Sequence, residues 1–411
     1  MAGLNETPSG DRTHIGFFGR RNAGKSSVVN AVTGQELAIV SETAGTTTDP
    51  VYKSMELLPL GPVVIIDTPG FDDAGTLGEL RVRKTKQVLN KTDIAILVVD
   101  KTAGMDTTDR QLIGLFQEKN LPFLIVYNKS DLTDNGETEA EKKAEENNIP
   151  ADRILCVSAK TKEGIFDLKE KIGSLKPSGE EKHFITDYLH PGELVMLVIP
   201  IDKAAPKGRL ILPEQMAVRE VLDAGAKAVV IQDDLITETL NELKKEPALV
   251  ITDSQVFQKA AEDVPENIPL TSFSILMAKY KGLLDTAIKG VTALDRLQDG
   301  DTVLIAEGCT HHRQCNDIGT VKLPNWIRKY TGKDILFKTC SGTEFPEDLS
   351  PYSFILHCGG CMLNEREVRF RMKCAVDQNV PISNYGISIA FMNGILKRAL
   401  GIFPELAAEI H

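Results

Sequence analysis

Short apolar stretches alternate with amphipathic stretches along most of this chain. Residues 94–99 and 194–199 are apolar throughout and rich in branched side chains. Uninterrupted apolar runs of this length are typical of parallel strands whose two faces are both covered. Comparable stretches predict further strands at residues 14–18, 63–66, 123–127, 154–157, 228–231, 248–251, 303–306, 335–338, 354–356 and 381–383. Helical patterns separate most of them, so the chain is predicted to have an α/β fold.

The predicted elements fall into three blocks. Residues 176–182 have the composition of a linker. We therefore expect domains at residues 1–175, 191–268 and 269–411, with a linker at residues 176–190. The middle block, a small parallel βαβ pattern with helices at 213–224, 235–244 and 255–261, has no recognisable catalytic motif, which favours a scaffold or subunit interface. The last block has helical patterns at 273–297, 364–378 and 387–400, and no internal repeat is apparent.

Composition argues against several classes of function. The chain has 411 residues, of which 58 are acidic and 47 basic, and its formal net charge is −11. It has no basic stripe that would bind a nucleic-acid backbone. No apolar run approaches the ~20 residues needed to span a bilayer, and the polar N-terminus lacks the apolar core of a signal peptide. We therefore expect a soluble, cytoplasmic protein with neither a membrane nor a nucleic acid as partner.

A phosphate-binding loop follows the first predicted strand. Residues 19–26 read Gly-Arg-Arg-Asn-Ala-Gly-Lys-Ser, a Walker A motif between a strand and a helix. The backbone N–H groups of such a loop and the helix N-terminus hold phosphate oxygens. Lys25 supplies a positive charge, and the Ser26 hydroxyl reaches Mg²⁺.

Later motifs complete a guanine nucleotide site. Asp67 in Asp-Thr-Pro-Gly would hold Mg²⁺, and the N–H of Gly70 would reach the γ-phosphate. Asp131 can accept both guanine-specific N–H groups, and residues 158–160 would present backbone N–H groups to the guanine O6. The predicted GTP-binding residues are Gly19, Asn22, Ala23, Gly24, Lys25, Ser26, Ser27, Thr46, Thr47, Asp67, Gly70, Asn128, Lys129, Asp131, Ser158, Ala159 and Lys160.

The first switch should lie at residues 45–49. Thr47 is the predicted Mg²⁺-binding hydroxyl, with Thr46 as the alternative. Phe71 stands after the second-switch glycine, where it leaves no side chain to orient the attacking water, so intrinsic hydrolysis should be slow. The predicted Mg²⁺ ligands are Ser26, Thr47 and Asp67. No catalytic side chain is assigned beyond the phosphate-stabilising Lys25, Thr47 and Gly70.

This block resembles the TrmE–Era subgroup of GTPases, in which a hydrophobic residue replaces the catalytic glutamine. In that subgroup an asparagine of the phosphate loop helps to bind a K⁺ ion, and Asn22 matches it. The subgroup usually has a proline before this asparagine, whereas this chain has Arg21. The alternative is that Asn22 only shapes the loop.

Cysteines and histidines gather at two predicted strand ends in the last block. Cys309-Thr310-His311 follows one strand, and residues 357–361 (His-Cys-Gly-Gly-Cys) follow another. The carboxyl ends of parallel strands border one crevice, so both segments can reach one metal. Cys358 and Cys361 are spaced to chelate one centre, and thiolates suit zinc as well as iron–sulfur clusters. The residues alone leave both metals open.

The combined pattern resembles the HydF family of [FeFe]-hydrogenase maturation GTPases. That family joins a TrmE–Era-like G domain to Cys-x-His and, further along, His-Cys-x-x-Cys. Residues 208–213 (Gly-Arg-Leu-Ile-Leu-Pro) and 317–324 (Asp-Ile-Gly-Thr-Val-Lys-Leu-Pro) also look familial. The resemblance covers essentially the whole chain.

The resemblance implies a GTP-binding domain (1–175), a dimerisation domain (191–268) and an iron–sulfur cluster-binding domain (269–411). It implies a [4Fe-4S] cluster on Cys309, Cys358 and Cys361, with His311 or His357 as a possible exchangeable ligand. The implied protein is a homodimeric GTPase scaffold that uses GTP, Mg²⁺ and K⁺. It would deliver a diiron subcluster precursor, supplied by the radical-SAM maturases HydE and HydG, to apo-[FeFe]-hydrogenase. The alternative is a zinc-stabilised GTPase of tRNA modification or ribosome assembly.

Overall fold

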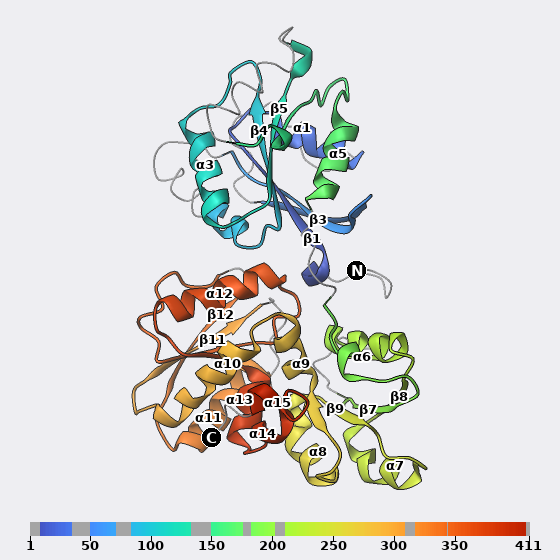
Figure 1. The fold of residues 1–411 in the computed structure, drawn as a ribbon. Helices are drawn as coiled ribbons and strands as arrows, with labels where there is room; N and C mark the ends of the chain where they lie inside the picture. The colour runs from blue at the N-terminus through green and yellow to red at the C-terminus, as the bar shows by residue number, and fades with distance from the viewer. Residues whose placement is uncertain are drawn as a thin grey trace. The chain divides into compact units, whose positions relative to one another are not determined.

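A computed structural model of the chain describes residues 9–34, 50–70, 84–132, 149–175, 182–201, 210–308, 317–342 and 344–407. The chain forms two compact units, Met1–Ser178 and Gly179–His411, which carry the blue-to-green and the green-to-red parts of the ribbon in Figure 1. No helix within the described ranges is long and apolar enough to cross a membrane.

The first unit is built on a six-stranded sheet with the order β2-β3-β1-β4-β5-β6. Among these strands only β2 is antiparallel to its neighbour, β3. The strands are β1 (Thr13–Phe18), β2 (Val51–Leu57), β3 (Gly61–Asp67), β4 (Ile94–Asp100), β5 (Phe123–Asn128) and β6 (Ile154–Cys156). Five of them coincide with predicted apolar runs, whereas β2 escapes prediction because most of its residues are exposed at the sheet edge.

Each face of this sheet has its own core. Ile15 and Phe17 pack with α1 (Lys25–Thr33) and α5 (Ile165–Ser174). On the other face, Phe18 packs with α3 (Thr107–Glu118), and Figure 1 shows these helices on opposite sides of the sheet. Helices on both faces explain the uninterrupted apolar runs. The arrangement brings the carboxyl ends of the central parallel strands to one edge, where the predicted nucleotide-binding loops begin.

The second unit contains two four-stranded parallel sheets, with the orders β10-β9-β7-β8 and β12-β11-β13-β14. The first has the strands β7 (Leu194–Val198), β8 (Lys227–Ile231), β9 (Leu249–Thr252) and β10 (Leu270–Ser272). The second has the strands β11 (Thr302–Glu307), β12 (Leu336–Ser341), β13 (Phe354–His357) and β14 (Ile382–Asn384). Together with the sheet of the first unit, they match the three α/β blocks predicted from the sequence.

These two sheets are structural repeats of each other. Read from their edge strands, the orders β8-β7-β9-β10 and β12-β11-β13-β14 are equivalent. The registers also agree: Val198 pairs with Ile231 and Thr252 as Ala306 pairs with Cys340 and His357. Pro-Leu-Thr-Ser-Phe at 269–273 likewise corresponds to Pro-Ile-Ser-Asn-Tyr at 381–385. The structure thus reveals a repeat that is not apparent in the sequence.

Two long predicted helices are each interrupted by a glycine. Gly282 (φ 71) lies between α9 (Phe273–Tyr280) and α10 (Leu284–Val291), and Gly394 (φ 71) lies between α13 (Tyr385–Met392) and α14 (Leu396–Ala399). A left-handed glycine ends a helix readily because it has no Cβ. The other α-helices described in this unit are α6 (Leu212–Asp223), α7 (Ile236–Glu242), α8 (Phe257–Asp263), α11 (Leu323–Thr331), α12 (Glu365–Asp377) and α15 (Pro404–Ala407).

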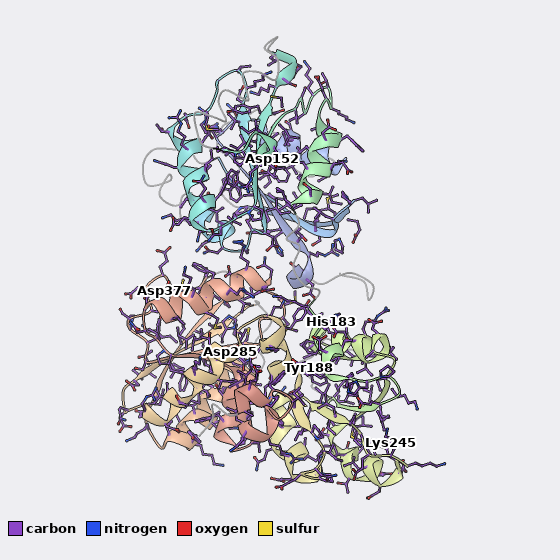
Figure 2. The ribbon with its side chains drawn as sticks, viewed as in Figure 1. Asp152, His183, Tyr188, Lys245, Asp285 and Asp377 are labelled. Atoms are coloured by element: carbon purple, nitrogen blue, oxygen red, sulfur yellow. The ribbon has the colours of Figure 1, made fainter. Side chains whose placement is uncertain are left out.

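One continuous hydrophobic core joins the two repeats. It includes strand residues of both sheets, among them Val195 and Val303. Tyr188, labelled in Figure 2, lies edge-on against Phe403, with 5.2 Å between ring centroids. The repeats therefore form a single compact unit rather than two independent bodies.

Candidate functional sites

The phosphate loop joins β1 to α1 through three residues with positive φ. Gly19 (φ 138), Asn22 (φ 61) and Gly24 (φ 86) adopt conformations that β-branched residues avoid. A Cβ on Gly19 would collide with the Val98 carbonyl oxygen, and one on Gly24 with the Asn128 amide. These glycines allow the loop to lie against β4 and β5.

Lys25, Ser26 and Asp67 form a polar group at the start of α1. The Lys25 ammonium donates to the carbonyl oxygens of Gly19 (3.0 Å) and Arg20 (2.8 Å). The Ser26 hydroxyl donates to one carboxylate oxygen of Asp67 at 2.7 Å. The other Asp67 oxygen is buried without a hydrogen-bond partner among the described residues, and burial raises the pKa of this carboxyl. A hydroxyl and an orphaned carboxylate oxygen fit a hard divalent cation such as Mg²⁺.

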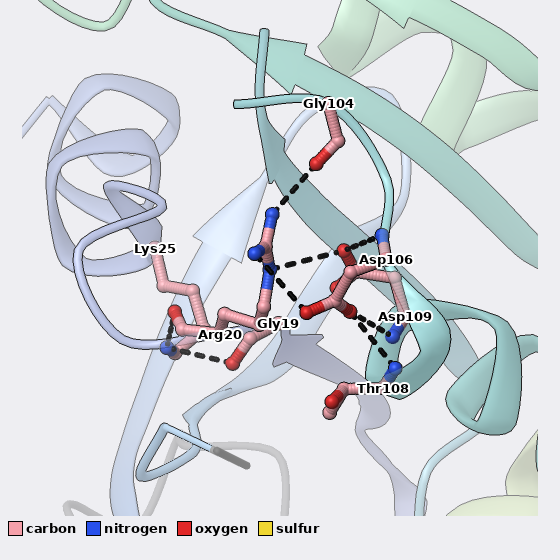
Figure 3. Close-up of polar contacts among 7 residues, drawn as sticks. All are labelled: Gly19, Arg20, Lys25, Gly104, Asp106, Thr108 and Asp109. Carbon is pink, nitrogen blue, oxygen red and sulfur yellow. Dashed lines mark hydrogen bonds and ion pairs between the residues drawn. The ribbon is translucent and has the colours of Figure 1, made fainter. Parts of the chain in front are cut away.

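An arginine that the sequence analysis does not single out anchors the phosphate loop. Figure 3 shows the Arg20 guanidinium donating to the Gly104 carbonyl at 2.6 Å and pairing with Asp106 (3.1 Å) and Asp109 (3.2 Å). Asp106 caps α3 and forms a capping box with Asp109. The phosphate loop is thereby tied to the start of α3. The Asp-x-x-Asp spacing ahead of an amphipathic helix is the sequence signal for this cap.

The predicted base-reading residues lie together at the ends of β5 and β6. The Asn128 amide donates to the Ala23 carbonyl (3.1 Å) and accepts from the Ala159 N–H (3.0 Å). The Ser158 hydroxyl donates to Asp131 at 2.7 Å. Asn128 therefore joins the phosphate loop to residues 158–160, and Ser158 orients the carboxylate predicted to read guanine.

Some of the remaining residues predicted to bind GTP lie within the described ranges, and others lie outside them. Lys129 (φ 69) pairs with Asp100 at 2.6 Å, and Ser27 and Lys160 lie within the described ranges. Gly70 lies against the phosphate loop, since a Cβ there would meet the Arg21 backbone nitrogen at 2.9 Å. The switch residues Thr46, Thr47 and Phe71 lie outside the described residues.

Cys358 lies at the carboxyl end of β13, at the edge predicted for a metal. Its sulfur accepts hydrogen bonds from the N–H groups of Gly308 (3.0 Å) and Gly360 (3.4 Å). Gly360 is left-handed (φ 66), which allows the turn between Cys358 and Cys361. Gly308 immediately precedes Cys309 in the chain, and Cys309 and His311 lie outside the described residues.

Burial makes an isolated thiolate unfavourable at this edge. It raises the pKa of Cys361 to about 11 and also raises that of Cys358. A bound cation reverses this preference, because a metal deprotonates its thiol ligands. Within the described ranges no three His, Cys, Asp or Glu side chains are placed to hold a metal ion. Cys358 and Cys361 are thus suited to be two of the ligands of a thiophilic metal.

His357 uses both ring nitrogens within the protein. Nδ1 lies 2.6 Å from the Cys358 carbonyl oxygen, and Nε2 lies 3.4 Å from the Arg371 guanidinium. The ring is fully buried, and burial, with the Arg371 charge second, lowers the pKa of His357 to about 3. Burial therefore disfavours the protonated form of His357, whose ring faces Arg371 and the Cys358 carbonyl.

Two buried acids near the cysteines are not predicted from the sequence. Glu307, which ends β11, is 2% exposed and accepts a hydrogen bond from the Tyr385 hydroxyl at 3.3 Å. Glu367 pairs with Arg371 at 3.0 Å. Charged residues are surface residues by default, so only the fold reveals that these lie beside the candidate metal centre.

Family models match all three blocks of the chain. A 50S ribosome-binding GTPase model matches residues 14–129. A hydrogen maturase F dimerization domain matches residues 184–282, and a hydrogen maturase F tetramerization domain matches residues 285–402.

Similar individual proteins are GTPases that match mainly the first unit. GTPase Der of Wolinella succinogenes is 35% identical over 174 residues, which is 41% of this chain and 36% of Der. The tRNA modification GTPase MnmE of Acetivibrio thermocellus is 29% identical over 213 residues, which is 51% of this chain and 45% of MnmE. The chain thus spans less than half the length of these relatives.

A solved structure of Era from Aquifex aeolicus matches 53% of this chain and 93% of its own, with 20% identity and a TM-score of 0.36. The first unit is a P-loop GTPase domain. Two consecutive hydrogen maturase F domains follow it, so the chain belongs to the hydrogen maturase F family.

Proposed function

We propose that this chain is a GTPase scaffold for [FeFe]-hydrogenase maturation. It binds a [4Fe-4S] cluster and carries a diiron subcluster precursor to the apo-hydrogenase. The observation that carries the proposal is that the N–H groups of Gly308 and Gly360 both donate to the Cys358 sulfur. Gly308, the residue before Cys309 in the sequence, therefore lies at the Cys-x-x-Cys turn. Membership of the hydrogen maturase F family supports it.

In the nucleotide site, Lys25 and the N–H of Gly70 hold the phosphates, and Ser26, Asp67 and Thr47 hold Mg²⁺, with Thr46 as the alternative to Thr47. Asp131 reads the base, together with the backbone of residues 158–160. The preformed contacts of Asn128 with Ala23 and Ala159 support this assignment.

Asn22 is the proposed K⁺ ligand. Its φ of 61 lies in the left-handed region that asparagine tolerates, and this is also what a purely loop-shaping residue would show. Turnover in KCl and in NaCl at equal ionic strength separates these roles. Faster hydrolysis in KCl that is lost in Asn22→Ala supports the ligand, and equal rates in the two salts contradict it.

At the metal centre, Cys309, Cys358 and Cys361 are the proposed cluster ligands, and the cluster would supply one iron without a protein thiolate. The exchangeable ligand of that iron is His311, a carboxylate or solvent. His357 can serve only if it leaves Arg371 and the Cys358 carbonyl, with which it is engaged. The Cys358 sulfur accepts hydrogen bonds from two N–H groups, which would hold this ligand in place for the cluster.

The second unit supports self-association. The family models name its halves for dimerization and tetramerization. The edge strand β8 exposes Val230 (49%), with Leu222 (60%) and Leu235 (40%) on adjacent elements. An uncovered apolar edge strand readily pairs with another edge. We therefore propose a homodimer formed through β8. The maturases HydE and HydG and the apo-hydrogenase are the proposed partners.

A second candidate is a zinc-stabilised GTPase that acts on RNA. It is favoured by the similarity to a relative named a tRNA modification GTPase. The net charge of −11 and the absence of a basic stripe from the sequence count against it. Zinc would be held by the same cysteines, so the metal content distinguishes the two candidates.

Activation of apo-[FeFe]-hydrogenase tests the proposal. The protein is loaded anaerobically together with HydE and HydG, repurified and mixed with the apo-enzyme, and hydrogen evolution is measured. We expect activation by the wild type and less than a tenth of it by Cys358→Ser. Activation that does not depend on this protein, or that survives Cys358→Ser unchanged, would contradict the scaffold role.

A further inference from the structure

Helix α12 (Glu365–Asp377) carries two acid–base pairs of the same spacing in different surroundings. Glu365 and Arg369 form an i,i+4 pair whose side chains are 34% and 60% exposed. Glu367 and Arg371 form an i,i+4 pair at 3.0 Å whose side chains are 6% and 0% exposed. An exposed i,i+4 pair already stabilises a helix, so burial of the second pair is not needed for helix stability. The buried pair therefore needs another explanation.

The Arg371 guanidinium joins three elements at the candidate metal centre. It donates to the Gly342 carbonyl oxygen, just beyond β12, and lies 3.4 Å from the His357 ring at the end of β13. It also lies over the Phe345 ring, 5.2 Å from its centroid. The planar, permanently charged guanidinium can make all these contacts at once, which a lysine ammonium cannot do. Arg371 thus fixes the strand end that continues into Cys358.

Burying a guanidinium removes its hydration, which costs free energy. Hydrogen-bond acceptors and an opposite charge around the group must offset that cost. Glu367 supplies one negative charge. The Arg371 guanidinium lies 3.4 Å from the ring of His357, and His357 directly precedes Cys358 in the chain. The cation thus lies within electrostatic reach of the sulfur, where an anionic metal centre would benefit from it.

We propose that Arg371 is a positioning residue for an anionic iron–sulfur cluster. It holds the His357–Cys358 strand end in place and sets the reduction potential of the cluster through its fixed positive charge. Glu367 opposes that charge and so tunes the potential in the other direction. This inference rests on the proposed cluster site.

A charge series on the full-length, anaerobically reconstituted protein tests the proposal. The midpoint potential is measured by redox titration followed by EPR. Because a nearby cation stabilises the reduced, more negative cluster, Arg371→Met should shift the potential to more negative values. Glu367→Gln should shift it to more positive values, and the double variant should return towards the wild type. A purely structural role cannot produce shifts of opposite sign that cancel.

The exposed pair on the same helix is the matched control. Arg369→Met and Glu365→Gln make the same charge changes where water screens them. Their potentials should equal that of the wild type. Equal shifts from the exposed and the buried pair would overturn the proposal.

If one variant fails to fold or to bind the cluster, another variant still tests the proposal. If Arg371→Met takes up no cluster, Glu367→Gln decides: a positive shift supports the proposal, and an unchanged potential overturns it. Arg371→Lys, which keeps the charge but not the planar fork, should retain the potential with an altered EPR line shape. A wild type that binds no iron would instead refute the proposed cluster site.

Discussion

At the residue scale, motif residues could be predicted from the sequence, whereas their supports could not. Lys25, Asn128 and Cys358 lie in short motifs whose spacing follows from backbone geometry. Arg20 and Arg371 are not recognisable as supporting residues in the sequence, because a charged side chain is expected at the surface. Only the fold shows that each is held by buried or partly buried acids.

Lys25→Ala should lower GTP turnover about a hundredfold or more, because it removes the positive charge on the phosphates. Iron content should not change, because the metal candidates lie in the other compact unit. Phosphate release and iron are measured on the same preparation. Arg110→Ala, an exposed change on α3, is the control. Turnover within a factor of two of the wild type would rule out the assigned role of Lys25.

Cys358→Ser should remove most of the bound iron, since a hydroxyl is a poor ligand for iron compared with a thiolate. Cys374→Ser, on α12 of the same unit, is the matched control and should retain the wild-type amount. Iron and sulfide are counted after anaerobic reconstitution. Parallel losses in both variants would mean that the effect is one of folding rather than of ligation.

At the element scale, apolar runs predict twelve of the fourteen described strands. The exposed strand β2 and the three-residue strand β10 escape prediction. Gly282 and Gly394 each interrupt a stretch that the hydrophobic periodicity predicts as one continuous helix. The repeat within the second unit is hidden because its equivalence lies in strand order and register rather than in runs of identical residues.

Helix α6 offers a pH test of the fold. Glu214, 6% exposed, accepts from the Ile211 N–H at 2.8 Å, and burial, with Asp253 as a further cause, raises its pKa to about 7. Ionisation of Glu214 is therefore less favourable in the folded protein than in the unfolded chain. This carboxyl favours folding most below its unfolded pKa of about 4.5, and that contribution is lost as the pH rises to 7.

Glu214→Gln should therefore become more stable relative to the wild type between pH 4.5 and 7, by up to about 3 kcal/mol. Glutamine keeps an oxygen that can accept from Ile211 and cannot ionise. Denaturant unfolding across this range is compared with that of Glu238→Gln, an exposed change on α7. A difference from the wild type that does not vary with pH would show that Glu214 titrates normally.

At the scale of the whole molecule, a GTPase unit and a duplicated α/β unit form one chain. The two repeats have diverged at equivalent positions. The register places Asp253, after β9, where the second repeat has Cys358, after β13. The candidate metal centre therefore belongs to one repeat, while the uncovered apolar edge of β8 belongs to the other.

Val230→Lys should weaken self-association, because it places a charge on the exposed edge of β8. Light scattering after size exclusion should show a smaller assembly than that of the wild type at the same concentration. Val51→Lys, a matched change on the edge strand β2 of the first unit, should not alter the mass. An unchanged assembly in Val230→Lys would place the interface elsewhere.

The central claim is that the cysteines of the second unit hold an iron–sulfur cluster rather than zinc. The most direct measurement is the metal and sulfide content of the protein purified without oxygen, together with its EPR spectrum after reduction. We expect a brown protein with iron and sulfide in equal amounts and the signal of a reduced [4Fe-4S] cluster. A colourless protein with one equivalent of zinc and no acid-labile sulfide would contradict the claim.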